Sequence, residues 1–81
     1  MRINIQFFSQ LKEISGAGDM TLELVEGSTV ADLLAQLYQR FPTLEKWDAN
    51  LLIGVGVEFV PRDHLLRPNE EIAIMPPVQG G

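Results

Sequence analysis

The chain has 81 residues, of which 46% are hydrophobic and 21% charged, values that fit one small domain and are too apolar for a disordered chain. The net charge of -5 argues against nucleic-acid binding, because neutralising phosphates needs clustered basic residues and the six present are scattered. The absence of cysteine excludes disulfides, thiolate nucleophiles and zinc-thiolate sites, and no apolar stretch reaches the roughly 20 residues of a membrane span.

The first third of the sequence predicts a β-hairpin. Residues 3–7 alternate apolar and polar side chains, which is the period of a strand with one buried face, and residues 20–24 repeat this alternation. Between them, residues 9–14 fit one helical turn with Ser9 as its cap, followed by a glycine-rich turn. A short connection of this kind favours antiparallel pairing of the two strands.

A single main helix is predicted next. Thr29, with Asp32 three residues later, resembles the capping box that opens a helix. Apolar residues then recur with helical spacing in one stripe, at Val30, Leu33, Leu34, Leu37, Tyr38 and Phe41. Pro42 ends the helix, because proline disfavours helical geometry in the residue before it. Residues 43–48 fit a further helical turn.

The second half of the sequence predicts further strands. Residues 51–55 read as a third strand, and residues 58–60 as a fourth or as the far arm of a hairpin; residues 72–75 form the closing strand. Long connections permit the first and last strands to pair in parallel. The expected fold class is α+β, a β-grasp arrangement with a mixed sheet of four to five strands and one main helix packed on one face.

The sequence closes with a segment suited to form a thin tail. The segment begins with two prolines, which favour extended backbone, and ends with two glycines. Its residues are Pro76, Pro77, Val78, Gln79, Gly80 and Gly81. Because glycine lacks a side chain, such a tail fits a narrow channel and brings its terminal carboxylate against a reactive centre. We therefore expect residues 1–75 to form the domain and residues 76–81 an extended diglycine tail.

Phe59 and Met75 are candidate partner contacts beside this tail. Strand alternation places Met75 on the face opposite Ile72 and Ile74, so a helix that covers the two isoleucines leaves Met75 partly exposed. Phe59 alternates in the same way with its neighbours in sequence. We expect both side chains to lie on an interaction surface.

Other chemistry-bearing residues show no site-like pattern. The one histidine, His64, lies in a predicted turn and is expected to be solvated. The acidic residues, including Glu70 and Glu71, lack metal-ligand spacing and are expected on the solvated surface, where this acidic pair could also meet basic residues of a partner. We expect no metal site. The pattern Gly54-x-Gly56 is expected to be a turn or bulge, because it lacks the context of a dinucleotide-binding loop.

The whole sequence resembles the family of small sulfur-carrier subunits of molybdopterin synthase, ubiquitin-like proteins of the MoaD type. The resemblance lies in the letters FF at residues 7–8, LKEISG at 11–16, TV at 29–30 and, above all, EEIAIMPPVQGG at 70–81. One departure is Gly56, where the family commonly has asparagine.

This resemblance implies a non-catalytic, sulfur-donating subunit of a sulfurtransferase complex. In the family, a ubiquitin-activating-like adenylyltransferase uses ATP to adenylate the terminal glycine, here Gly81, and a sulfur donor protein converts it to a thiocarboxylate. The tail then enters the large synthase subunit, in a heterotetramer, and donates sulfur to cyclic pyranopterin monophosphate. The carrier itself is expected to bind no cofactor and to be cytoplasmic, without membrane contact.

Two other functions share the same tail chemistry. A related carrier would serve thiazole, cysteine or tRNA thiolation, whereas a ubiquitin-like modifier would form isopeptide bonds with lysines of other proteins. A purely structural β-grasp module is the least favoured interpretation, because it has no need for a free diglycine end.

Overall fold

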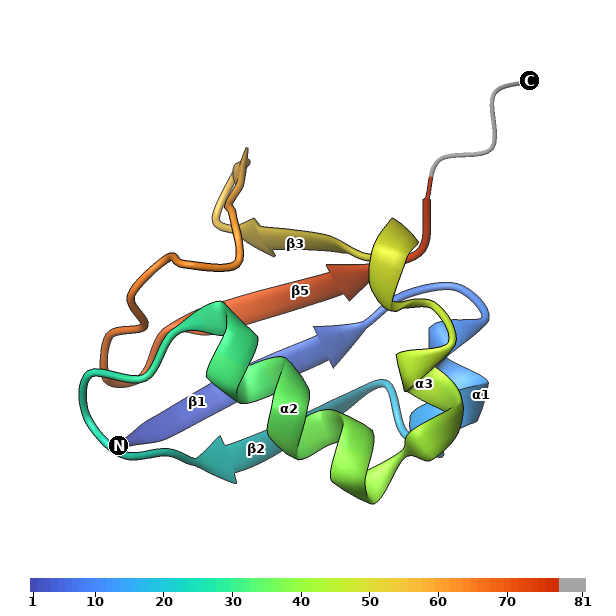
Figure 1. Cartoon of the computed structure of the whole chain (residues 1–81), viewed down its shortest axis with the longest axis horizontal. Helices are drawn as coiled ribbons and strands as arrows, with labels where there is room; N and C mark the ends of the chain where they lie inside the picture. Colours follow the sequence, from blue (N-terminus) through green and yellow to red (C-terminus); the bar gives the residue numbers. More distant parts are fainter. Residues whose placement is uncertain (78–81) are drawn as a thin grey trace.

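The computed structural model describes residues 1–77 and shows a five-stranded sheet with helices on one face (Figure 1). Its elements follow the chain as β1 (Arg2–Phe7), α1 (Leu11–Ser15), β2 (Asp19–Glu23), α2 (Val30–Arg40), α3 (Pro42–Glu45), a 3-10 turn η1 (Asp48–Asn50), β3 (Leu52–Val55), β4 (Glu58–Phe59) and β5 (Glu71–Met75). The predicted order of strands and main helix is confirmed. The fourth strand is the far arm of a hairpin with β3.

The strands are arranged in the order β2-β1-β5-β3-β4. β1 pairs with β5 in parallel, with Ile5 opposite Ile72 and Phe7 opposite Ile74, and the other neighbouring strands pair antiparallel. This is the ubiquitin-like β-grasp arrangement expected from the sequence. Its consequence for function is that β5, the strand that leads to the tail, lies at the centre of the sheet.

The core lies between α2 and one face of the sheet. It contains Ile3, Ile5 and Phe7 of β1, Ile72 and Ile74 of β5, and the helical stripe Val30, Leu33, Leu34 and Leu37, all of which are buried. The rings of Phe7 and Phe41 meet edge to face with centroids 6.4 Å apart, a favourable aromatic geometry. The opposite face of the sheet carries no helix in the described part of the chain (Figure 1).

The start of α2 is fixed by side chains and by a distant loop. The predicted capping box is present, since Asp32 N–H donates to Thr29 Oγ1 at 3.3 Å and Thr29 N–H donates to Asp32 Oδ2 at 2.9 Å. Two further N–H groups of the first turn donate to the carbonyls of Arg62 and His64, at 2.9 and 3.0 Å. These bonds satisfy donors that a helix start leaves unpaired, and they hold the loop between β4 and β5 against the helix.

The prediction that Ser9 caps the first helical turn was wrong. α1 begins at Leu11, its preceding residue is Gln10, and no side chain caps it. Ser9 has a φ of 53°, in the left-handed region, whereas a capping residue usually has extended backbone. Ser9 bonds to the helix through its backbone carbonyl, which accepts the Lys12 N–H at 3.1 Å, and not through its hydroxyl.

A polar cluster ties the end of the helical layer to the loop after β4. The hydroxyl of Tyr38 donates to Asp48 Oδ1, and Arg62 Nη1 donates to the same oxygen at 2.9 Å, while Arg62 Nη2 donates to the Asp48 carbonyl at 2.6 Å. The bonds from Tyr38 and Arg62 hold the pKa of the Asp48 carboxyl below its ordinary value of 3.8. Burial and the bond to Asp48 raise the pKa of Tyr38.

This cluster predicts a pH-dependent contribution to stability. Because the pKa of Asp48 is lower in the folded chain than in the unfolded chain, its contribution is full above pH 3.8 and is lost as pH falls below that value. Asp48 is 47% exposed, so we expect no more than about 1 kcal/mol. Urea unfolding of the native chain and Asp48→Asn, at about pH 6 and pH 3, measures it: the difference between them should shrink at the lower pH. An unchanged difference would contradict the assignment.

Candidate functional site

An apolar surface surrounds the point where the chain leaves β5. We call it the tail-base patch and define it as Phe8, Leu52, Phe59, Met75, Pro76 and Pro77. With Ser9 and Gln10, these residues line a hollow of about 450 Å³. Phe59 is 65% exposed and Phe8 39%, whereas Leu52, Met75 and the two prolines are partly buried. Exposed aromatic side chains grouped in this way are typical of an interaction surface.

The strand register brings the tail-base patch together on the open face of the sheet. Met75 pairs with Leu52 across the β5–β3 ladder, and Phe59 pairs with Gly54 across the hairpin. Ile74, between Met75 and Ala73, points into the core and is fully buried. The predicted orientation of Met75 away from the isoleucines therefore agrees with the structure, while its role in binding stays a prediction, as does that of Phe59.

Two glycines shape this surface. A Cβ at Gly54 would lie 3.2 Å from the terminal methyl of Met75, so the absence of a side chain leaves room for Met75 beside the hairpin. Gly56 is the first of two residues that join β3 to β4, and its φ is +63°. Asparagine is one of the few other residues that tolerate this backbone, which explains why the departure at Gly56 is compatible with the fold.

Phe8 and Leu52 belong to the patch but were not among the predicted contacts. Phe8 directly follows the buried Phe7, so its side chain has the opposite orientation, and its N–H donates to the Ile74 carbonyl at 3.1 Å. Leu52 joins the patch through its pairing with Met75. The alternation of β1 could have indicated Phe8, whereas Leu52 requires knowledge of the strand register.

Only the first part of the predicted tail falls within the described residues. Pro76 and Pro77 follow β5 directly and line the hollow. The predicted site residues Val78, Gln79, Gly80 and Gly81 lie outside the described residues. The division into a domain over 1–75 and a tail over 76–81 stays a prediction.

His64 and Glu70 are less exposed than expected. The side chain of His64 is 27% exposed and that of Glu70 13%, with His64 Nε2 at 3.5 Å from Glu70 Oε2. Glu70 also accepts the N–H of Arg67 at 3.0 Å. Both side chains belong to the loop between β4 and β5. Their exposure is low because this loop packs against the start of α2 instead of extending into solvent.

Within residues 1–77, no three histidine or carboxylate side chains lie close enough to hold a metal ion. None of the described helices has the length and apolar character needed to cross a bilayer.

Sequence comparison places the chain in a known family. The model of the ThiS family matches residues 5–81, nearly the whole chain. The chain belongs to the ThiS family. This ThiS-family chain is 34% identical to the "Molybdopterin synthase sulfur carrier subunit" of Chlamydomonas reinhardtii, with 100% of both chains covered. It is 30% identical to the protein of the same name from Arabidopsis thaliana, with 100% of this chain and 84% of the relative covered.

Solved structures similar to this ThiS-family chain share its fold. The small archaeal modifier protein 1 of Methanosarcina acetivorans superposes with a TM-score of 0.81 at 26% identity, covering 99% of this chain and 96% of that one. One subunit from a protein-protein complex of subunits 1 and 2 of the molybdopterin-converting factor from Helicobacter pylori gives 0.72 at 21% identity, with full coverage of both chains.

Proposed function

We propose that this chain is the cytoplasmic sulfur-carrier subunit of molybdopterin synthase. The observation that carries the proposal is its full-length similarity to relatives of that name. The geometry supports it, because an exposed apolar patch surrounds the point where the chain leaves the central strand β5 toward its C-terminus. The patch offers a docking surface, and the tail beyond it carries the reactive group.

The chemistry uses the carboxylate of Gly81. A carboxylate is a poor acyl electrophile, so an activating adenylyltransferase transfers AMP from ATP to it and pyrophosphate leaves. Sulfide supplied by a donor protein then attacks the acyl carbon, AMP leaves, and a thiocarboxylate forms. The carrier contributes the reactive end and the docking surface, while ATP and the acid-base residues belong to its partners, and the carrier itself binds no cofactor. This division fits an acidic chain, which would repel anionic substrates.

The large subunit of the synthase is the partner proposed for the tail-base patch. When this surface docks, Pro76 and Pro77 direct the following residues into the large subunit, where the Gly81 thiocarboxylate donates its sulfur to cyclic pyranopterin monophosphate. The exposed Phe59 suits such a contact, because aromatic residues dominate the binding energy of many interfaces. The proposed assembly is a heterotetramer of two carriers and two large subunits.

Intact mass spectrometry tests the proposal directly. Incubation with the activating enzyme, ATP and a sulfur source should raise the mass of the chain by about 16 Da, because one sulfur replaces one oxygen and no cysteine thiol competes for it. Fragmentation should place the sulfur at Gly81. A gain on an internal residue, or no gain with an activating system proven on another carrier, would refute the carrier function.

A second candidate function is that of a ubiquitin-like modifier, which the similarity to the modifier protein of Methanosarcina acetivorans favours. A modifier joins its C-terminus to lysines of other proteins, so a chain with an N-terminal affinity tag, incubated with lysate and ATP, would yield conjugates larger than the tagged chain itself. Sulfur gain without such conjugates supports the carrier, whereas conjugates without pterin conversion support the modifier.

A further inference from the structure

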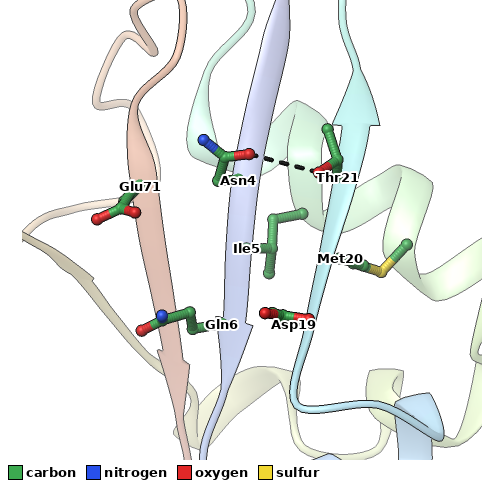
Figure 2. A pocket seen from close by; sticks show the side chains of 7 residues that line it. All are labelled: Asn4, Ile5, Gln6, Asp19, Met20, Thr21 and Glu71. Atoms are coloured by element: carbon green, nitrogen blue, oxygen red, sulfur yellow. Dashed lines mark hydrogen bonds between the residues drawn. The ribbon is translucent and has the colours of Figure 1, made fainter.

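A polar hollow lies beside the tail-base patch on the open face of the sheet. It has a volume of about 380 Å³ and is lined by residues of β1, β2 and β5. Figure 2 shows the side chains of Asn4, Gln6, Asp19, Thr21 and Glu71 gathered over these three strands. Thr21 Oγ1 donates to Asn4 Oδ1 at 3.4 Å, so the main remaining acceptors of the hollow are the carboxylates of Asp19 and Glu71 and the amide oxygen of Gln6.

The two carboxylates of this hollow have no cationic partner among residues 1–77. Asp19 and Glu71 are exposed and take part in none of the ion pairs of the described chain, whereas Glu23, at the end of β2, pairs with Arg2 at 3.5 Å. Lys12 lines an adjacent hollow together with Asp19 but forms no ion pair with it. Of the two carboxylates, Glu71 therefore has less positive charge near it than Asp19. The negative charge of this surface is complementary to a cation.

The polar hollow is continuous with the tail-base patch. The adjacent hollow is lined by Gln6 and Asp19, which also line the polar hollow, and by Phe8, which belongs to the tail-base patch. A protein that docks on the apolar patch can therefore also reach the polar hollow. Interfaces are commonly built in this way, with an apolar centre and a polar rim.

We propose that this polar hollow receives an arginine side chain of the large synthase subunit. The proposal rests on the proposed function and adds a specific contact to it. A guanidinium has several donors in a planar fork, which suits acceptors on adjacent strands about 4.8 Å apart better than the compact charge of lysine. Glu71 on β5 and the amide oxygen of Gln6 on β1 are such acceptors, since Gln6 lies two residues after Asn4, the residue that pairs with Glu71. The arginine sets the register of docking, while the tail-base patch supplies most of the affinity.

Calorimetric titration of the large subunit with carrier variants tests this contact. Glu71→Gln should weaken binding by about tenfold at low salt and reduce the salt dependence of the affinity, because one charge-assisted contact is lost. Asp19→Asn should have a smaller effect, since Lys12 lies nearby. Glu26→Gln is the matched control: it removes one exposed charge between β2 and α2, outside the polar hollow and the tail-base patch, and should leave affinity within about twofold.

The outcomes separate this inference from the proposed function. If the native carrier does not bind the large subunit at all, the proposed function fails, and the inference fails with it. If the native carrier binds and Glu71→Gln matches Glu26→Gln in affinity and salt dependence, only the inference fails. If Glu71→Gln weakens binding to the activating enzyme but not to the large subunit, the polar hollow is wrongly assigned to the large subunit. Melting curves should coincide for all variants, because the replaced side chains are exposed.

Discussion

Removal of Gly81, or extension of the chain beyond it, is expected to abolish sulfur transfer while the free energy of unfolding changes by no more than about 0.5 kcal/mol. Activity should be lost because the reactive carboxylate would be absent or misplaced. Stability should persist because the last core residue of the described chain is Ile74, two positions before Pro76. Single-turnover conversion of the pterin precursor and urea unfolding of the same samples measure both effects.

Gly18→Ala is a suitable control for the loss of a glycine. A Cβ at this position meets no atom within 4 Å, so the variant should transfer sulfur like the native chain. Normal conversion by a chain that ends at Gly80, or that carries a C-terminal tag, would overturn the thiocarboxylate mechanism.

The second large effect is expected at the tail-base patch. Phe59→Ala should weaken binding to the large subunit by about 30-fold, the loss typical of a central aromatic contact, while stability changes by less than about 1 kcal/mol because the ring is 65% exposed. Met75→Asp should weaken binding at least as much. It should also cost more stability than Phe59→Ala, because Met75 is partly buried and a carboxylate there loses hydration.

Val25→Ala provides the control for the loss of an exposed apolar side chain. Val25 is 79% exposed and lies between β2 and α2, outside the tail-base patch, so neither affinity nor melting temperature should change. Collapse of the melting temperature in Phe59→Ala would show that the ring is structural, since a buried phenylalanine costs about 3–5 kcal/mol on truncation. Unaltered affinity in both patch variants would exclude this surface as the docking site.

The elements of the fold could be predicted where side chains repeat with a clear period. The alternation of Ile3, Ile5 and Phe7, the apolar stripe of α2 and the capping box formed by Thr29 and Asp32 all carry local signals that the structure confirms. The loop between β4 and β5 carried none, because it joins α2 through backbone carbonyls, which any sequence provides. His64 and Glu70 were therefore expected in solvent although they lie against the domain.

The candidate site was predicted only in part for a similar reason. Strand alternation gave the orientation of Met75 and the exposure of Phe59 from their immediate neighbours. Leu52 joins them through a register between β3 and β5, strands separated by a long connection. The polar hollow over β1, β2 and β5 also depends on which strands are adjacent, and the parallel pairing that creates it leaves no local pattern in the sequence.

The central position of β5 has a mechanical consequence for a protein whose C-terminus is proposed to be bound and modified by other proteins. β5 is bonded to β1 on one side and to β3 on the other, and β1 runs in the same direction (Figure 1). If a pull on the chain at Pro76 is directed along the axis of β5, the ladder bonds on both sides resist together in shear instead of opening one after another. A partner that pulls in this direction can therefore draw the C-terminus into a channel, or release it, without unravelling the domain from its end.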